Sequence, residues 1–270
     1  MTQTEPIFNL DSCSPQQTKT RRKKLPTEGK IYFISDAHLG EDISKVEKSK
    51  EERLIAFLRH IAQDAAFLYV VGDLFDFWFE YKQAVPARHH RVLHRLATLV
   101  QQGIHTVYVA GNHDFCLGHF LSQEIGMEVS AQPLAVEHHG LRLFVAHGDG
   151  LASKDRGYRF LKKILRHPLS VWLYRQVHPD IGLPLGKLIS ASSRAYTDQK
   201  ALKMVAEYEL AARQKLSQGF DAVILGHSHY PILRRFGEKT YLNIGDWITH
   251  FTYGMLQEGK LTLEKWEKNL

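Results

Sequence analysis

The chain has few of the features that mark membrane-spanning, secreted or thiol-based proteins. It holds two cysteines in 270 residues. Cys13 and Cys116 are far apart, so we expect neither a thiolate metal site of the CxxC type nor a structural disulfide. No stretch approaches the roughly 18 uncharged apolar residues of a membrane span, and residues 1–30 lack the apolar segment of a secretory signal. We therefore expect a soluble globular protein of the cytoplasm, with one main core.

Positive charge is concentrated in one part of the chain. The formal net charge is +6, and residues 151–218 hold thirteen Lys/Arg against five Asp/Glu. Residues 1–30 are also basic, so the remainder of the chain is acidic. A basic segment of this kind suits nucleic acid, an anionic ligand or a membrane surface, and it also fits a solvated helical face with no partner.

Short apolar runs alternate with helix-like stretches after residue 30. The runs are rich in β-branched and aromatic residues, and Asp, Gly or His lies at or just after their ends: Ile31–Ser35, Phe67–Val71, His105–Ala110, Leu141–Ala146 and Ala222–Leu225. The first three are separated by the helix-like stretches Lys48–Gln63 and Ala87–Gln102. This alternation predicts a layered α/β fold with its functional residues on loops at the strand ends.

Three segments depart from this alternation. Residues 1–30 are polar, basic and broken by Pro and Gly, which predicts a flexible N-terminal arm. Residues 151–218 are helix-like, basic and apolar, which predicts a helical cap inserted between the two parts of a core, 31–150 and 219–270. The C-terminal runs are separated by glycine-containing turns, and we expect them to form a strand meander that completes a second sheet: Leu233–Phe236, Thr240–Ile244, Phe251–Leu256 and Lys260–Trp266.

Five polar clusters follow five of the predicted strands. Each combines a side chain that can bind metal with a glycine or a tight turn that allows close approach. The clusters are Asp36-Ala37-His38, Gly72-Asp73, Gly111-Asn112-His113-Asp114, His147-Gly148-Asp149 and Gly226-His227-Ser228-His229. A lone histidine is usually an ordinary surface residue, but five such clusters at successive strand ends predict one shared metal site.

The side chains of these clusters indicate which metals they suit. Imidazole together with carboxylate favours Mn²⁺, Fe²⁺ or Zn²⁺, whereas an all-oxygen set would favour Mg²⁺ or Ca²⁺. Two ions about 3.5–4 Å apart need a ligand that belongs to both, and a carboxylate with two oxygens does this best. We therefore expect two divalent ions, with Mn²⁺ preferred, joined by one aspartate.

The order of the clusters resembles the calcineurin-like metallophosphoesterases, whose blocks run D-x-H, G-D, G-N-H-D/E, H and G-H-x-H. The match spans residues 31–247. The resemblance implies a four-layer α/β fold, with two β-sheets sandwiched between helices and a helical cap as an insertion. It also implies the ligands, which are Asp36, His38, Asp73 and His229 for the first metal, and Asp73, Asn112, His147 and His227 for the second.

The same resemblance implies two catalytic residues that do not bind metal. His113 follows Asn112 and would face the substrate, where it would stabilise the charged phosphorane or protonate the leaving group. Asp114 would orient His113, as a carboxylate behind an imidazole commonly does.

Three local features resemble one branch of this superfamily, the UDP-2,3-diacylglucosamine diphosphatases of lipid A synthesis. They are the run Gly72–Trp78, the run His147–Tyr158 with its glycines, and the long helical insertion. This resemblance implies a hydrolase that cleaves UDP-2,3-diacylglucosamine to UMP and 2,3-diacylglucosamine 1-phosphate, by attack of metal-activated hydroxide on the phosphorus nearer the uridine. It places Asp155 and Tyr158 at the sugar-phosphate headgroup, and Trp78 at the rim of the substrate groove.

One block departs from that branch and leaves alternatives open. Its best-known enzymes read G-N-R-D where this chain reads Gly111–Asp114, so a metal-dependent phosphodiesterase acting on another nucleotide or on nucleic acid is an alternative. A binding scaffold that has lost catalysis is a third class, although here every ligand position is filled.

The composition of the predicted cap favours the lipid-linked sugar nucleotide over nucleic acid. Acyl chains need a large apolar area, and Lys and Arg suit anionic headgroups. We therefore expect peripheral contact with the inner membrane surface. The same apolar residues also suit simple packing of the cap onto the core.

Overall fold

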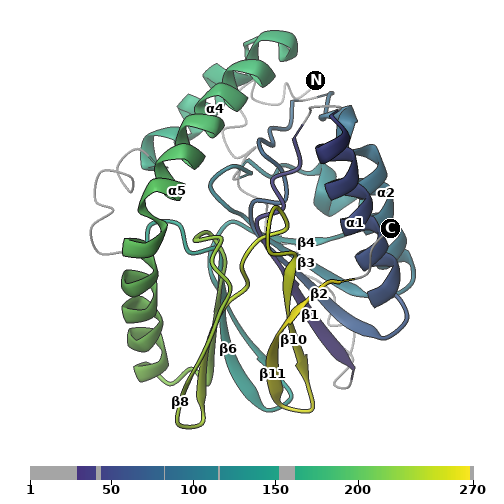
Figure 1. Ribbon diagram of the computed structural model, residues 1–270. Coiled ribbons are helices and arrows are strands. Elements are labelled where there is room, and N and C mark those ends of the chain that lie inside the picture. Colours follow the sequence, from purple (N-terminus) through teal and green to yellow (C-terminus); the bar gives the residue numbers. More distant parts are fainter. Residues whose placement is uncertain (1–28, 41–43, 82, 115, 152–161, 268–270) are drawn as a thin grey trace, which may run out of the picture.

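Two β-sheets lie face to face, with helices on the outer side of each (Figure 1). The structure is a computed structural model that describes residues 29–40, 44–81, 83–114, 116–151 and 162–267, without the side chains of 189–204. The arrangement confirms the predicted four-layer α/β fold.

The first sheet has the strand order β11-β10-β1-β2-β3-β4. Strands β1 to β4 pair in parallel, while β10 and β11 continue the sheet in antiparallel pairing from β1. The strands are β1 (Lys30–Ile34), β2 (Ala65–Val71), β3 (His105–Val109), β4 (Glu128–Ser130), β10 (Thr252–Gln257) and β11 (Lys260–Lys265). The parallel pairing brings the carboxyl ends of β1, β2 and β3 to one edge of the sheet.

The second sheet has the strand order β5-β6-β7-β9-β8. Strands β6, β7 and β9 pair in parallel, and the two edge strands pair antiparallel with their neighbours. The strands are β5 (Leu134–His138), β6 (Leu141–Ala146), β7 (Ala222–Leu225), β8 (Ile232–Phe236) and β9 (Lys239–Asn243). The carboxyl ends of β6 and β7 carry the remaining predicted clusters.

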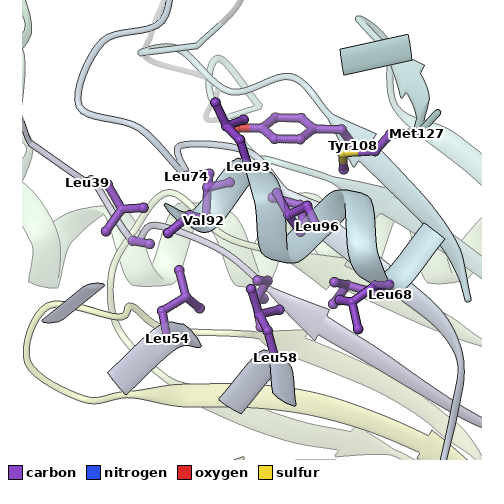
Figure 2. Close-up of a cluster of buried hydrophobic side chains, with 14 of the residues drawn as sticks. Leu39, Leu54, Leu58, Leu68, Leu74, Val92, Leu93, Leu96, Tyr108 and Met127 are labelled. Carbon is purple, nitrogen blue, oxygen red and sulfur yellow. The ribbon is translucent and has the colours of Figure 1, made fainter. Parts of the chain in front are cut away.

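Side chains of the first sheet alternate between two cores. Ile31 and Phe33 belong to the core between the sheets, whereas Tyr32 and Ile34 pack toward helices α1 (Lys45–Ile61) and α2 (His90–Gln101). Figure 2 shows this second packing, with leucines of both helices in one cluster with Leu68 of β2. Each fully buried Leu contributes roughly 1.5–3 kcal/mol relative to an exposed one.

A long helix covers the outer face of the second sheet. Helix α5 (Pro179–Ser217) follows α4 (Pro168–Arg175), and its C-terminal part buries Tyr208, Ala212 and Leu216 against that sheet. Figure 1 shows α4 and the start of α5 rising beyond the strand ends. Among the described residues, no helix is both long and apolar enough to cross a membrane.

Aromatic side chains join α4 and the start of α5 to the loop that follows β2. The rings of Phe79 and Tyr174 pack at a tilt of 60°, with their centroids 4.6 Å apart, and Val171 is buried against Phe79. Gly186 lets α5 approach the same loop, because a Cβ there would lie 2.4 Å from the ring of Phe77. Helices α4 and α5 therefore pack on the segment that follows β2.

The structure corrects three expectations about the fold. The C-terminal strands do not all complete the second sheet, because β10 pairs with β1, with Ile31 opposite Leu256, and carries β11 into the first sheet. The strands β4 and β5 were not predicted. The expectation of no disulfide is also wrong, since Cys116 is disulfide-bonded, and the chain's other cysteine, Cys13, lies outside the described residues.

Candidate dimetal site

The loops that follow β1, β2, β3, β6 and β7 meet at one edge of the two sheets. His38 N donates to the carbonyl of Asp73, and Gly226 N donates to the carbonyl of His147, so neighbouring loops are tied to one another. His113 N donates to Oδ1 of Asp73 and His227 N to Oδ2 of Asp36, so the loop after β3 and the second sheet are joined as well. Together these bonds bring the seven predicted metal ligands to one place.

Five of these ligands have a strained backbone. Asp36, His38, Asp73, His227 and His229 have φ between 42° and 68°, a region that non-glycine residues rarely occupy. Each such residue costs about 1–3 kcal/mol and persists only where the surrounding structure enforces it, commonly at functional sites. The strain is therefore concentrated at the residues predicted to bind metal.

Two glycines make room for the ligands. Gly72 has φ of 78°, and a Cβ at this position would lie 2.6 Å from Nδ1 of His147. A Cβ on Gly111 would lie 2.0 Å from Oδ1 of Asp73. A larger residue at either position would displace a predicted ligand.

The first cluster consists of Asp36, His38 and His229. The two Nε2 atoms of the histidines are 3.1 Å apart. Oδ1 of Asp36 lies 3.3 Å from Nε2 of His229 and 3.6 Å from Nε2 of His38. Three ligand atoms thus converge on one point.

The second cluster consists of Asp73, Asn112, His147 and His227. Nε2 of His147 lies 3.2 Å from Oδ2 of Asp73 and 3.1 Å from Oδ1 of Asn112. Nδ1 of His227 is 3.2 Å from the same nitrogen.

Asp73 links the two clusters through a single oxygen. Its Oδ2 lies 3.7 Å from Nε2 of His38 and 3.2 Å from Nε2 of His147, one atom from each cluster. Its Oδ1 instead accepts a hydrogen bond from the backbone N of His113 at 2.9 Å. The residue predicted to bridge is therefore correctly placed, although one oxygen and not two faces both clusters.

These distances fit metal coordination. With metal–ligand bonds of about 2.0–2.2 Å, two ligands of one ion are about 3.0–3.5 Å apart, as most of these atom pairs are. The buried Oδ1 of Asp36 has no hydrogen-bond partner among the described residues, and an unpaired buried carboxylate oxygen is costly without a cation. The donors are nitrogen and oxygen, which suit Mn²⁺, Fe²⁺ or Zn²⁺.

Hydrogen bonds behind the ligands fix their orientation. Nδ1 of His147 lies 2.9 Å from the carbonyl oxygen of Val71, which leaves Nε2 free to bind metal. Oδ2 of Asp36 accepts from Ser35 Oγ at 2.5 Å and from His227 N at 2.8 Å.

Two supporting residues were not predicted as part of the site. Asp76 Oδ1 lies 3.5 Å from Nδ1 of His38, so it stands behind that imidazole. Lys50 is buried and donates to the carbonyl of His38 at 2.6 Å. The sequence gives no periodic signal for Lys50, because its contact arises from the position of α1 beside the first cluster.

Neighbouring histidines lower the pKa of Asp36 and of Asp73, so both carboxylates are ionised. Burial acts to raise the pKa of Asp73, but the neighbouring His147 and His113 outweigh it, so the pKa is lowered. Burial acts to lower the pKa of His147, but Asp73 and Asp36 raise it to about 10. A metal ion must displace such protons, because imidazole binds metal in its neutral form.

His113, which was predicted to face the substrate, lies close to the oxygen of Asp73 that links the two clusters. Its Nε2 is 3.9 Å from Oδ2 of Asp73, and its Nδ1 is 3.0 Å from the carbonyl oxygen of Asp76. Burial lowers the pKa of His113, and Asp73 offsets this only in part. The neutral ring therefore donates from Nδ1 and directs Nε2 toward the site.

Asp114 does not have the predicted role behind His113. Its oxygens accept hydrogen bonds from Gly111 N at 2.8 Å, from Leu74 N at 2.9 Å and from the hydroxyl of Tyr108. Burial, followed by Asp73, raises the pKa of Asp114 to about 6. Asp114 thus holds the loops after β2 and β3 together. The group that orients His113 is the carbonyl oxygen of Asp76 and not the carboxylate of Asp114.

Trp78 does not line a groove. Only 1% of its surface is exposed, and its ring stacks on Phe75 at 4.6 Å between centroids. Its indole Nε1 donates to Oε1 of Glu80 at 3.2 Å. Trp78 therefore belongs to the core beneath α2, which corrects its assignment to the substrate groove.

The two remaining substrate residues, Asp155 and Tyr158, lie outside the described residues. The nearest described part of the cap carries Lys162 and Arg166, which approach Asp149. Asp149 was part of a predicted cluster but had been given no role of its own.

The chain is similar in sequence to known proteins over most of its length. A family model described as calcineurin-like phosphoesterase matches residues 29–231. UDP-2,3-diacylglucosamine hydrolase of Porphyromonas gingivalis is 34% identical over 260 residues, with 88% of this chain and 98% of that protein covered. The protein of the same name from Aeromonas salmonicida is 30% identical over 238 residues, with 86% and 92% covered. Among solved structures, Yfce, a phosphoesterase from E. coli, matches with a TM-score of 0.45 and 17% identity, over 88% of this chain and 93% of that one.

Proposed function

The chain belongs to the calcineurin-like phosphoesterase family, and on that basis we propose that it hydrolyses UDP-2,3-diacylglucosamine to UMP and 2,3-diacylglucosamine 1-phosphate. The two relatives named above carry the name of that hydrolase and are covered almost from end to end. The observation that carries the proposal is the pair of ligand clusters sharing Oδ2 of Asp73, beside helices with exposed apolar side chains.

The proposed metal centre uses the seven ligands described above. Asp36, His38 and His229 would hold one ion, Asn112, His147 and His227 the other, and Asp73 both. Two bound ions supply Lewis-acid activation of water and of phosphoryl oxygens. The nitrogen and oxygen donors favour Mn²⁺ as the natural metal, with Fe²⁺ or Zn²⁺ as substitutes.

His113 is our candidate for contact with the reacting phosphoryl group. Its ring is held from Nδ1 by the carbonyl of Asp76, and its Nε2 lies 3.9 Å from the oxygen that joins the clusters. Because Nδ1 already donates to Asp76, a proton on Nε2 would make the ring a cation; the anionic phosphoryl group would favour that form, which would stabilise negative charge as it develops on the phosphoryl oxygens. The leaving group here is a phosphate monoester, which is weakly basic, so charge stabilisation is the main task of this residue.

Exposed apolar side chains on α4 and α5 favour a lipid-linked substrate over a free nucleotide. Leu169 is 52% exposed, Leu173 54% and Leu188 68%. Trp172, Ile181 and Leu185 add to the same two helices with exposures between 38% and 63%. Apolar area on this scale suits acyl chains, whose burial is worth about 25 cal/mol per Å². We propose that residues 151–218 form the cap that receives them, at the surface of the membrane that supplies the substrate.

The test is a comparison of substrates with the purified, Mn²⁺-loaded protein. UDP-2,3-diacylglucosamine, single-stranded DNA and cyclic nucleotides are assayed in parallel, and the lipid sugar nucleotide is expected to give the highest kcat/KM. Hydrolysis in ¹⁸O-labelled water is expected to place the label in UMP, as attack on the phosphorus nearer the uridine requires. Faster turnover of a nucleic acid or cyclic nucleotide would overturn the proposed substrate, and label in the lipid phosphate would overturn the proposed point of attack.

A further inference from the structure

A cavity of about 330 Å³ lies beside His147. Three described parts of the chain form it: the ends of β3 and β6 with the residues that follow β6, the connection between β4 and β5, and the first described turn of the cap. It is distinct from the exposed apolar side chains of α4 and α5, none of which lines it.

The order of the strands places this cavity on one side of the metal site. β4 is the edge strand of the first sheet next to β3, and β5 is the edge strand of the second sheet next to β6. β3 leads to Asn112 and β6 leads to His147, so the cavity adjoins the second cluster and lies away from the strand that carries Asp36.

Positive charge dominates the described lining of the cavity. Lys162, Lys163 and Arg166 line it together with one carboxylate, Asp149, which Lys162 and Arg166 approach. Lys162 Nζ lies 2.5 Å from Oδ2 of Asp149, and Arg166 donates to the carbonyl of Gly111 at 2.8 Å. Lys163 is exposed and has no carboxylate partner within the described part of the chain. The described lining residues therefore carry a net formal charge of +2, which suits an anionic ligand.

The remaining wall suits a flat ring with polar edges. Val109, Ala131, Pro133 and Leu151 are apolar, and Gln132 adds an amide that can donate and accept. A volume of about 330 Å³ is at the low end for small-molecule pockets. It suits one nucleotide and is too small for a lipid with two acyl chains.

We propose that this cavity binds the nucleotide half of the substrate, a pyrimidine nucleoside 5′-monophosphate group, with its phosphate toward His147 and Lys163. The inference rests on the proposed function, and it adds an orientation. The nucleotide lies on the side of Asn112 and His147, while the acyl chains lie along α4 and α5. The two positive charges complement the dianionic phosphate of the nucleotide product.

The test measures binding of UMP, uridine and inorganic phosphate to the full-length, metal-loaded protein by calorimetry. Lys163→Glu is expected to raise the Kd for UMP about tenfold or more, since one charged contact is worth roughly 1.5–3 kcal/mol. Ala131→Trp, which fills the cavity without changing its charge, is expected to weaken both UMP and uridine. Lys260→Glu, an exposed charge reversal at the first residue of β11, is the matched control and is expected to leave UMP binding unchanged.

The outcomes separate this inference from the proposed function. Unchanged UMP affinity in both cavity variants, with metal content intact by mass spectrometry, would overturn the nucleotide site even if the lipid sugar nucleotide is hydrolysed. Equal weakening of UMP and inorganic phosphate, with no binding of uridine, would overturn the nucleotide assignment in favour of a plain phosphate pocket. UMP binding that depends on Lys163, in a protein that hydrolyses no sugar nucleotide, would support the cavity and refute the proposed function.

Discussion

Replacing Trp78 with alanine is expected to unfold the protein at a lower temperature, with little effect on recognition of the lipid. The indole is 1% exposed and stacks on Phe75, so its removal leaves a large cavity in the core. Buried Trp→Ala changes cost about 3–5 kcal/mol. In a chain of this size each kcal/mol lowers Tm by about 2–4 °C, so the expected decrease is roughly 6–20 °C.

A graded series makes this prediction sharper. Trp78→Phe keeps a ring against Phe75 but removes the indole donor to Glu80, so it is expected to cost about 1–3 kcal/mol. Trp172→Ala is the matched control, because Trp172 is 38% exposed on α4. It is expected to change Tm by little and to raise KM for the lipid sugar nucleotide.

The assay is scanning calorimetry of metal-loaded protein, with kinetics measured well below the lowest Tm. A Trp78→Ala protein with unchanged Tm and a tenfold higher KM for the lipid sugar nucleotide would refute the reasoning. It would restore the assignment of Trp78 to the substrate groove.

Three further predictions concern the metal centre and acid stability. Asp73→Ala is expected to lose both metals and all activity, with metal content read by mass spectrometry; full occupancy of either ion would contradict the shared role of Asp73. His113→Ala is expected to keep its metals and to lose roughly 10²–10⁴ in kcat, so a metal-free variant would instead make His113 a ligand. Burial, followed by Arg88, lowers the pKa of His89 to about 3. Stability from its neutral form is therefore complete above about pH 6.5 and is lost as pH falls toward 3. At pH 5 the loss is about 2 kcal/mol. Denaturant unfolding of His89→Phe between pH 7 and 5 is expected to show a slope shallower by up to about 1.4 kcal/mol per pH unit, and identical slopes would exclude this effect.

The placement of the metal ligands could be predicted because it depends on simple rules. Parallel strands put their carboxyl ends at one edge, so ligands that follow β1, β2 and β3 must lie near one another. The second sheet brings in His147 and His227 by the same rule. The prediction that the ligands lie together needs only the strand order and direction, and not the conformation of any loop.

The roles of the side chains behind the ligands could not be predicted in this way. Asp114 follows His113 directly, but the tight turn sends its carboxylate toward Leu74 and Tyr108. Lys50 reaches the site from α1 through the packing of that helix on the first sheet. Such contacts depend on side-chain direction and on distant segments, and neighbouring positions in a sequence do not reveal them.

The segment that follows β2 shows a periodicity that explains the error over Trp78. This segment forms isolated bridges, Leu39 with Phe75 and Phe79 with Cys116, so it is locally extended. In an extended chain, alternate side chains point to opposite sides. Trp78 accordingly enters the core, whereas its neighbours Phe77 and Phe79 contact the cap helices. The alternation does not extend back to Phe75, which shares the core with Trp78 because the chain bends at residues 76 and 77.

The same segment links the helices α4 and α5 to the predicted metal site. Asp73 and Asp76 lie at the metal clusters, while Phe77 and Phe79, a few residues later, hold α4 and α5. A shift of α4 or α5 is therefore expected to move the loop that carries Asp73. Gly186 makes this link close, because a Cβ there would meet the ring of Phe77 at 2.4 Å. The aromatic residues of this segment thus hold α4, α5 and the loop that carries Asp73 in one fixed relation, and a shift of either helix is expected to change the position of Asp73.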